Sequence, residues 1–328
     1  MPESNDGNRE MRAVVYERYG GPDGLRVASV AIPTPAADEI RVRVSACAVN
    51  LSDWEYLVGS PFYTRMIDGL MRPRTQILGS DIVGVIDELG SQVSGLSVGQ
   101  RVMGDFVMTR RGFADFACVP ARDAVIVPAD LTDEIAACLP QAGGIAVSGS
   151  AGVEKGTRLL INGAGGGSGT MALQLAKAAG AHVTVVDNST KIEWLRSLGA
   201  DEVLDYREVD FAESGKRWDM VLDMVATRGP RRIAKALADG GSYKAVGGGV
   251  PVLLALVFGG RLWSRNRSIG MLFVPSGQAL TERVARMAIE GSIRPHIDSV
   301  LPLAEVADAI ARTGRGEVRG KIVIRPGL

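Results

Sequence analysis

A glycine-rich loop constrains the fold of this chain more than any other feature. Five of the seven residues from Gly163 to Gly169 are glycine, and the loop joins an apolar run, RLLIN, to a helix-like run, GTMALQLAKAAG. Backbone without a Cβ turns tightly and lets a pyrophosphate approach, and the following helix N-terminus offers N–H groups and partial positive charge. We therefore expect a dinucleotide cradle; a turn that serves only helix–strand packing is the alternative. The residues of the expected cradle are Gly163, Ala164, Gly165, Gly166, Gly167, Ser168 and Gly169.

The end of the next predicted strand should select the cofactor, and it carries two opposing signals. Asp187 can accept hydrogen bonds from the adenosine ribose hydroxyls, which favours NAD(H) and repels a 2′-phosphate. Lys191, with Asn188, Ser189 and Thr190 beside it, can instead bind that phosphate, which favours NADP(H). A third interpretation is that Asp187 and Ser189 only cap the next helix. The preference between NADP(H) and NAD(H) stays open.

The pattern of the chain predicts an α/β protein of two domains. From Leu131 onward, strand-like and helix-like runs alternate, which indicates βαβ units and a doubly wound parallel sheet. The first third reads as strands with glycine every few residues, as a small barrel-like β domain requires. A length of 328 residues also favours two cores over one.

Composition excludes several classes of function. Acidic and basic residues number 37 each, so no net field favours nucleic acid. Cys47, Cys118 and Cys138 are too few and too scattered for a disulfide framework, which fits a reducing compartment. The N-terminal MPESNDGNRE lacks the apolar core of a signal peptide, and the apolar run 250–258 is too short to span a bilayer. We expect a cytoplasmic protein with no transmembrane segment and a small-molecule substrate.

Several motifs in a fixed order resemble one enzyme family. They are AVNLSDWEYLVG, LGSDIVGVIDELG, the glycine loop, SLGADEVLDY and GSIRPHIDSVLPLAEVADAI followed by GEVRGKIVI. The chain resembles the medium-chain dehydrogenase/reductases, in particular their zinc-free quinone oxidoreductase-like and enoyl reductase-like branch. The resemblance implies a GroES-like β-rich catalytic domain, residues 1–127 completed by 268–328, with a Rossmann domain, residues 128–267, inserted and the active site in the cleft.

The resemblance also implies that no zinc is bound. Where zinc-dependent relatives have their first metal ligand, this chain has Asn50, and their His-Glu pair is replaced by Ser80-Asp81. His182 and His296 lie outside the matching motifs. Without a Lewis acid, hydride transfer is most accessible for an acceptor that conjugation already activates, such as a quinone or an α,β-unsaturated ketone or aldehyde.

Four residues of the N-terminal domain are candidates for catalysis. Asn50 can donate its amide to a carbonyl oxygen, or it can merely fix its loop. Asp53 follows in the family's N-x-x-D pattern, where a structural or gating role is more common than that of an acid. Tyr56 and Tyr63 carry phenols that can act as proton donors.

Further cofactor contacts follow from the resemblance alone. Val246, Gly247 and Gly248 resemble the segment beside the nicotinamide, and Lys321 resembles the family's last cofactor contact. The chain departs from the family pattern in the segment LPQAGGIAVSG, where Ile145 replaces the threonine that contacts nicotinamide in relatives.

Three functions therefore stay open. The first is a zinc-independent NAD(P)H-dependent reductase of quinones or enones. The second is an enoyl reductase on a carrier- or CoA-bound chain, which needs a basic entrance such as Arg261, Arg265 and Arg267. The third is a cofactor-binding structural or regulatory protein with little turnover. Relatives pair by joining their cofactor-domain sheets, so the resemblance implies that the apolar PVLLALVF segment lies at a homodimer interface at the edge of the Rossmann sheet; a contact of this segment with a membrane surface is the alternative.

Overall fold

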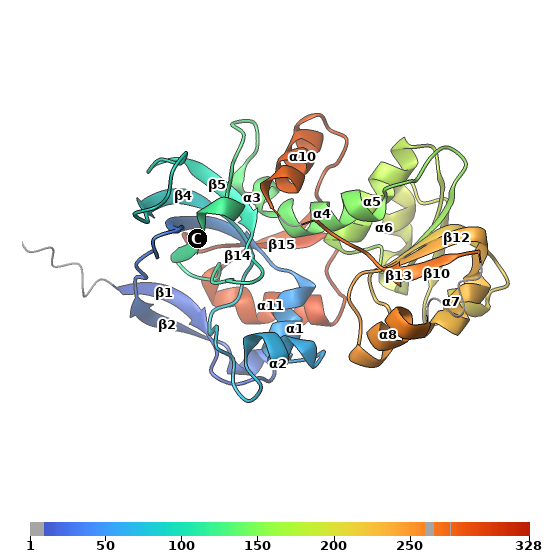
Figure 1. The fold of residues 1–328 in the computed structure, drawn as a ribbon, viewed down its shortest axis with the longest axis horizontal. Coiled ribbons are helices and arrows are strands. Elements are labelled where there is room, and N and C mark those ends of the chain that lie inside the picture. Colours follow the sequence, from blue (N-terminus) through green and yellow to red (C-terminus); the bar gives the residue numbers. More distant parts are fainter. Residues whose placement is uncertain (1–9, 260–265, 276) are drawn as a thin grey trace, which may run out of the picture. The chain divides into compact units, whose positions relative to one another are not determined.

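The computed structural model describes residues 10–259, 266–275 and 277–328 (Figure 1). The chain packs into two compact units. Unit 1 comprises Met1–Pro140, Gly277–Ala285 and Ile297–Leu328, and unit 2 comprises Gln141–Ser276 and Arg286–His296. The boundaries proposed from the sequence, after residues 127 and 267, lie upstream of these divisions. Arg261 and Arg265 lie outside the described residues.

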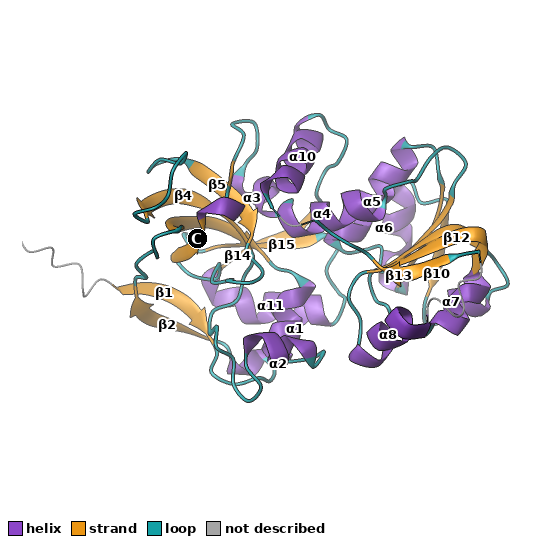
Figure 2. Cartoon of the chain, viewed as in Figure 1, coloured by secondary structure: helices purple, strands orange, loops and turns teal. Residues whose placement is uncertain are grey.

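Unit 1 is built on a seven-stranded sheet, with one separate antiparallel pair, β1-β2 (Figure 2). The sheet has the order β14-β15-β3-β4-β5-β7, and β6 also pairs with β3. The strands are β1(Glu10–Val15), β2(Arg26–Ala31), β3(Glu39–Ala48), β4(Asp81–Leu89), β5(Arg101–Asp105), β6(Phe116–Pro120), β7(Val125–Ile126), β14(Ile297–Pro302) and β15(Lys321–Arg325). The last strand, β15, runs antiparallel to β3, so the C-terminal part of the chain completes the sheet that the N-terminal part begins.

Three helices of unit 1 are stacked beside this sheet. Helix α1(Leu51–Val58) lies between α2(Tyr63–Asp68) and α11(Val306–Gly314), and α2 forms the outer edge of the stack (Figure 1). The contact between α1 and α11 is close, because a Cβ on Gly314 would lie 2.3 Å from the Trp54 ring. Helix α3(Asp133–Ala137) belongs to unit 1, whereas α4(Pro140–Gly149) and α10(Gln278–Ile289) each cross a boundary between the two units along the chain.

Unit 2 contains a six-stranded parallel sheet of order β10-β9-β8-β11-β12-β13. Its strands are β8(Arg158–Asn162), β9(His182–Asp187), β10(Glu202–Asp205), β11(Trp218–Asp223), β12(Leu237–Ala245) and β13(Ser268–Met271). The central strands are buried almost throughout, as expected where helices cover both faces of a sheet. This arrangement confirms the predicted α/β class.

The helices of unit 2 divide between the two faces of its sheet. Figure 1 shows α5 and α6 on one face and α7 and α8 on the other. They are α5(Gly167–Ala178), α6(Ile192–Ser197), α7(Pro230–Ala236) and α8(Val250–Leu254). The single-turn elements of the whole chain are η1(Pro22–Gly24), η2(Ala121–Asp123), η3(Ser189–Lys191), η4(Phe211–Glu213), η5(Ala255–Gly259, a π-turn) and η6(Leu303–Glu305). Because the chain leaves β8 toward β9 on one side and later adds β11 on the other, the sheet has a switch point between β8 and β11.

One predicted element ends earlier than expected. The run GPRRIAKALADGG predicts a helix over residues 229–241, but α7 ends at Ala236 and Leu237 already begins β12. Pairing with β11 outweighs local helix propensity here, and Gly240, with φ of 77°, adopts a left-handed backbone inside the strand. Among the described residues, no helix is long and apolar enough to cross a bilayer.

Candidate active site

The glycine loop leaves the carboxyl end of β8 at the switch point of unit 2. Gly163 has φ of 80°, which lets the chain turn sharply out of the strand. Gly169 lies against the loop, because a Cβ there would come within 2.5 Å of the Ala164 carbonyl oxygen. At Gly166, the N-cap of α5, a Cβ would meet no atom within 4 Å. Gly163 and Gly169 therefore serve the turn and the packing, and Gly166 leaves open space at the helix N-terminus.

Asp187 and Lys191 form a pair and do not compete for one ligand group. The Lys191 Nζ lies 3.5 Å from Asp187 Oδ1, and both side chains are buried. Asp187 Oδ2 accepts a hydrogen bond from the Gly165 N–H at 2.7 Å, and Oδ1 accepts two from Asn188. The Lys191 chain passes so close to the loop that a Cβ on Gly165 would lie 2.5 Å from its Cδ. The pair thus fixes the first turn of the glycine loop.

The capping interpretation of this segment needs a correction. Asn188 is the N-cap of η3, and its side chain accepts a hydrogen bond from the Thr190 N–H at 3.1 Å. Neither Asp187 nor Ser189 caps the turn, since Asp187 is turned back to the glycine loop. Ser189 and Thr190 are exposed.

Sequence reasoning missed a buried polar network at the ends of three neighbouring strands. Asp223, at the end of β11, accepts hydrogen bonds from Asn162 Nδ2 at 2.7 Å and from the Tyr243 hydroxyl at 2.9 Å. Its Oδ1 also accepts the N–H groups of Val225 and Ala226. The signal in the sequence was an aspartate, Asp223, that interrupts the apolar run of DMVLDMV.

The predicted segment 246–248 lies next to this network. Its first residue, Val246, donates its N–H to the Asp223 carbonyl oxygen at 2.8 Å. Gly247 and Gly248 have φ of 73° and 120°, and a Cβ on Gly248 would lie 2.9 Å from the Ala226 carbonyl oxygen. The backbone therefore follows a path that only glycine adopts easily, at the same edge of the sheet as the glycine loop.

In unit 1, the predicted residues Asn50 and Lys321 are brought into direct contact. Lys321, which begins β15, donates from Nζ to Asn50 Oδ1 at 2.5 Å and to the Val49 carbonyl at 2.9 Å. Asn50 Nδ2 donates to Ser80 Oγ at 3.1 Å, and Asp81 Oδ2 lies 3.6 Å from the Lys321 ammonium. The positions that resemble metal-ligand positions thus lie around a buried lysine ammonium.

Asp53 holds the two loops of this cluster together. As residue N3 of α1, it accepts the Asn50 N–H at 2.8 Å, and its other oxygen accepts the Gly79 N–H at 2.8 Å. Burial raises the pKa of Asp53 to about 6, although both hydrogen bonds and the nearby Lys321 oppose that rise. Asp53 thus joins the N-terminus of α1 to the segment that carries Gly79.

Tyr56 lies inside unit 1 and takes part in packing. The Arg110 guanidinium lies 3.9 Å from the centre of its ring and forms an ion pair with Asp68 at 2.6 Å. All three side chains are buried, and burial raises the pKa of the Tyr56 phenol. Tyr56 is therefore part of the structural support of α1 and α2.

Tyr63 has a carboxylic partner that sequence reasoning missed. Its hydroxyl donates to Glu55 Oε2 at 3.5 Å, which joins the start of α2 to α1. Burial raises the pKa of Glu55 to about 7 and that of Tyr63 to about 12. The signal in the sequence was an acidic residue two positions after Asp53, on a helix whose other side carries Tyr56.

The fold and these two clusters define a class of protein. A doubly wound parallel sheet with an open glycine loop at its switch point is typical of dinucleotide-binding domains. Unit 1 adds a buried set of hydrogen-bond donors and titratable groups, which suits an oxidoreductase. Among the described residues, no group of three or more His, Cys, Asp or Glu side chains could hold a metal ion.

Comparison with known proteins identifies the family. Residues 36–129 match the family described as "Alcohol dehydrogenase GroES-like domain", and residues 198–324 match "Zinc-binding dehydrogenase". The "Chloroplast envelope quinone oxidoreductase homolog" of Arabidopsis thaliana is 31% identical over 332 residues, which cover 96% of this chain and 98% of that protein. The "2-methylene-furan-3-one reductase" of Solanum lycopersicum is 30% identical, over 97% of this chain and 79% of that protein.

A solved structure agrees with these relatives. The quinone oxidoreductase from Coxiella burnetii superimposes with a TM-score of 0.87 at 25% identity, over 97% of this chain and 99% of that one. The chain belongs to the medium-chain dehydrogenase/reductase superfamily, in its quinone oxidoreductase-like branch. It is an oxidoreductase, as the sequence predicted.

Proposed function

We propose that this protein transfers hydride from NAD(P)H to a conjugated carbonyl compound, a quinone or an α,β-unsaturated ketone or aldehyde. The observation that carries the proposal is the set of hydrogen bonds that the Asn50 side-chain amide makes. Its oxygen accepts a hydrogen bond from Lys321, and one of its N–H groups donates to Ser80; the second N–H has no hydrogen-bond partner among the residues that the structure describes and is available for a carbonyl oxygen. The relatives named as a quinone oxidoreductase and a furanone reductase support this substrate class.

The lysine makes that amide a stronger donor. An ammonium at 2.5 Å from Oδ1 polarises the amide, and chains of hydrogen bonds strengthen one another where water is excluded. When hydride reaches a conjugated acceptor, negative charge develops on its oxygen, where such a donor stabilises it. We propose that Lys321 acts through Asn50 as a positioning residue; the cofactor contact that the resemblance implied for it stays a prediction. We propose that the protein needs no zinc.

The second chemical requirement is a proton. Reduction of an enone adds hydride at the β-carbon and a proton at the α-carbon or the oxygen. The hydrogen-bonded pair of Tyr63 and Glu55 in unit 1 is best suited to supply it. The Tyr63 phenol donates the proton, and the Glu55 carboxyl group, with a pKa of about 7, can reprotonate the phenolate near neutral pH.

We propose that the cofactor is bound by the loop 163–169 and that NADPH is preferred. The negative charge of Asp187 is already engaged by Gly165, Asn188 and Lys191, so it opposes a 2′-phosphate less than the sequence alone suggested. Beyond the neighbouring strand β10, the exposed Arg207 adds a cation, and the N–H of the preceding Tyr206 is bonded to the Asp187 carbonyl oxygen.

The carrier-dependent enoyl reductase receives less support. Of the three arginines considered for a basic entrance, Arg267 is described, and its guanidinium pairs with Asp239 at 2.8 Å and with the Ala238 carbonyl. This arginine is engaged in fixing the start of β13 and is poorly placed to attract a phosphate.

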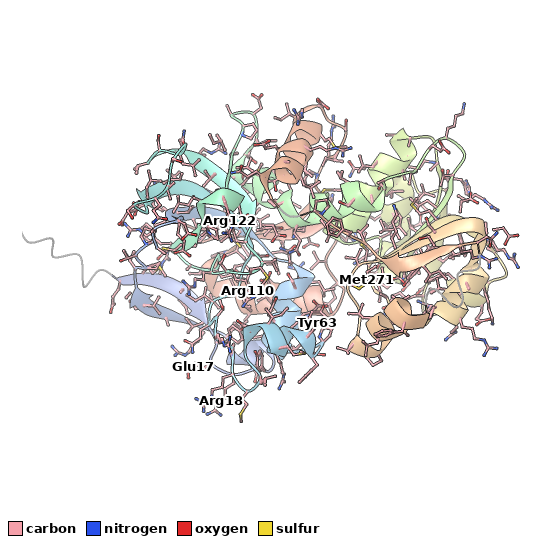
Figure 3. All side chains as sticks on the ribbon, viewed as in Figure 1. Glu17, Arg18, Tyr63, Arg110, Arg122 and Met271 are labelled. Carbon is pink, nitrogen blue, oxygen red and sulfur yellow. The ribbon has the colours of Figure 1, made fainter. Side chains whose placement is uncertain are left out.

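We also propose a homodimer formed at the edge strand β13 of unit 2. This edge presents Met271, labelled in Figure 3, and Phe273, which are 48% and 82% exposed, and the nearby apolar segment exposes Phe258. An unpaired apolar edge favours pairing with a second copy. A monomer in light scattering at micromolar concentration would refute this part of the proposal.

The function is tested by following NADPH oxidation with a panel of soluble quinones and enones. The wild type should reduce conjugated carbonyls and leave saturated ketones untouched. Asn50→Leu should lower kcat/KM by about 10²-fold, the cost of losing one donor to a developing oxyanion. Unaltered NADPH binding in fluorescence titration serves as the control. Binding without turnover of any acceptor would favour the cofactor-binding structural or regulatory protein instead.

A further inference from the structure

Helix α2 presents its polar residues to the protein and its apolar residues to solvent. Thr64 and Asp68 are buried, and Asp68 is neutralised by its ion pair with Arg110. Five large apolar side chains of the same helix and its flanks are between 45% and 90% exposed: Phe62, Met66, Ile67, Leu70 and Met71. A soluble helix normally shows the opposite pattern, so this patch needs an occupant.

The charges beside this patch indicate what the occupant is. Between residues 62 and 74 the basic residues are Arg65, Arg72 and Arg74, and the one acidic residue is the buried Asp68. Arg72 and Arg74 are exposed, and neither forms an ion pair with any residue that the structure describes. The chain as a whole has balanced charges, so this excess of positive charge is local. Apolar side chains flanked by unpaired arginines match the apolar boundary and anionic head groups of a lipid membrane.

The position of α2 in unit 1 leaves this face accessible. The helix is the outermost of the three stacked helices, and Figure 3 shows Arg18, from the loop after β1, at the same edge of the unit. Arg18 is exposed and adds a further cation next to Tyr19, whose hydroxyl donates to the Gly69 carbonyl oxygen directly after α2. Arg18 thus adds positive charge at this edge of unit 1, where the neighbouring Glu17 is paired with Arg26 at 2.8 Å.

We propose that the outer face of α2, defined by Phe62, Met66, Ile67, Leu70 and Met71 with Arg72 and Arg74, docks on the surface of an anionic lipid membrane. Tyr63 begins the same helix, so docking brings the proposed proton donor to the lipid boundary. Acceptors dissolved in the membrane, such as quinones with long alkyl chains, then become the substrate class; this step rests on the proposed function.

Vesicle sedimentation tests the docking surface. Wild-type protein should sediment with vesicles of phosphatidylcholine and phosphatidylserine in equal parts, more weakly with phosphatidylcholine alone, and less at high salt. Leu70→Ser combined with Met71→Ser should lower binding to both vesicles. Arg72→Gln and Arg74→Gln should each lower binding to the anionic vesicles about fivefold, the equivalent of about 1 kcal/mol per charge.

Matched changes elsewhere provide the controls. Val98, 62% exposed on a turn of unit 1, is changed to Ser, and the exposed Arg217 of unit 2 is changed to Gln. Both variants should bind vesicles like the wild type. Wild-type protein that stays in the supernatant, or controls that lose as much binding as the α2 variants, would overturn the proposal. So would a dimer that the Leu70 and Met71 changes convert to monomer without vesicle binding, because a second copy would then cover the patch.

A kinetic comparison separates this inference from the proposed function. On a water-soluble quinone, the Leu70→Ser/Met71→Ser variant should keep the wild-type kcat/KM. On a long-chain quinone held in the anionic vesicles, its kcat/KM should fall at least tenfold. Equal rates on the vesicle-held quinone would refute the substrate class, whereas absence of turnover of the soluble quinone by the wild type would refute the proposed function and leave the vesicle-binding result standing.

Discussion

Replacement of Lys321 by methionine tests the central cluster of unit 1. The substitution keeps an unbranched chain of similar length but removes the ammonium group. Asn50 Oδ1 and the Val49 carbonyl oxygen lose their shared donor, and the buried Asp81 carboxylate loses a cation 3.6 Å away. Because these groups are buried, water cannot replace the lost contacts without opening the structure.

The expected loss of stability follows from these contacts. A hydrogen bond from a charged donor contributes about 1.5–3 kcal/mol, and breaking a buried ion pair costs about 3–5 kcal/mol. The contacts share one ammonium and cannot simply be added, so we expect Lys321→Met to lower the free energy of unfolding by about 3 kcal/mol. For a unit of this size that corresponds to a fall in melting temperature of about 6–12 °C.

Thermal unfolding, followed by circular dichroism, measures the effect. Lys235→Met is the matched control, because Lys235 pairs with Glu213 on the surface and should contribute less than about 1 kcal/mol. Adding Asp81→Asn to Lys321→Met should recover part of the loss, since it removes the carboxylate left without its cation. The reasoning is wrong if Lys321→Met stays within about 1 kcal/mol of the wild type, or if the double variant is as unstable as the single one.

Four further predictions concern Arg110, the glycine loop and Glu55. Arg110→Met should destabilise the protein by about 3–5 kcal/mol in urea unfolding, because the buried Asp68 carboxylate loses its ion pair. Wild-type stability of this variant would contradict the prediction. Gly169→Ala should reduce both stability and NADPH affinity, whereas Gly166→Ala, with open space around its Cβ, should reduce only NADPH affinity in fluorescence titration. The kcat/KM of the wild type should fall as pH rises through about 7, where Glu55 loses its proton. In Glu55→Gln this fall of kcat/KM with pH should be absent. The same raised pKa makes stability depend on pH: the contribution of neutral Glu55 is complete below about pH 4.5 and is lost as pH rises through 7. Melting curves of the wild type should show this dependence, and those of Glu55→Gln should not.

The sequence predicted the fold well wherever a local pattern determines it. The glycine loop, with a buried strand before it and a helix after it, specified the β8–α5 unit from residues that are adjacent in the chain. The end of α7 was predicted too late, because the pairing of β12 with β11 is decided by residues far from the segment itself.

The candidate site was less predictable, because its contacts join distant residues. Asn50 and Lys321 were each named from the resemblance, but their direct bond depends on the pairing of β15 with β3. From the sequence, Asp187 and Lys191 are expected to favour different cofactors, because a sequence does not show which way two neighbouring side chains turn; in the structure they form an ion pair. The sequence also does not show that the apolar residues of α2 are exposed to solvent, because their burial depends on the packing of the whole unit.

The pairing of β15 with β3 has a consequence for how the enzyme is made. Lys321 and Asn50 are 271 positions apart in the chain, and every strand of unit 2 is synthesised between them. During translation, unit 2 can begin to fold while β3 is paired with β4 and β6 but not yet with β15, and Asn50 meets the Lys321 ammonium only after Lys321 has been synthesised. Contacts of such large sequence separation form late and slowly. The bond between Asn50 and Lys321 can therefore form only after all the described strands of unit 2 have been synthesised, and a nascent chain with a folded unit 2 still lacks it.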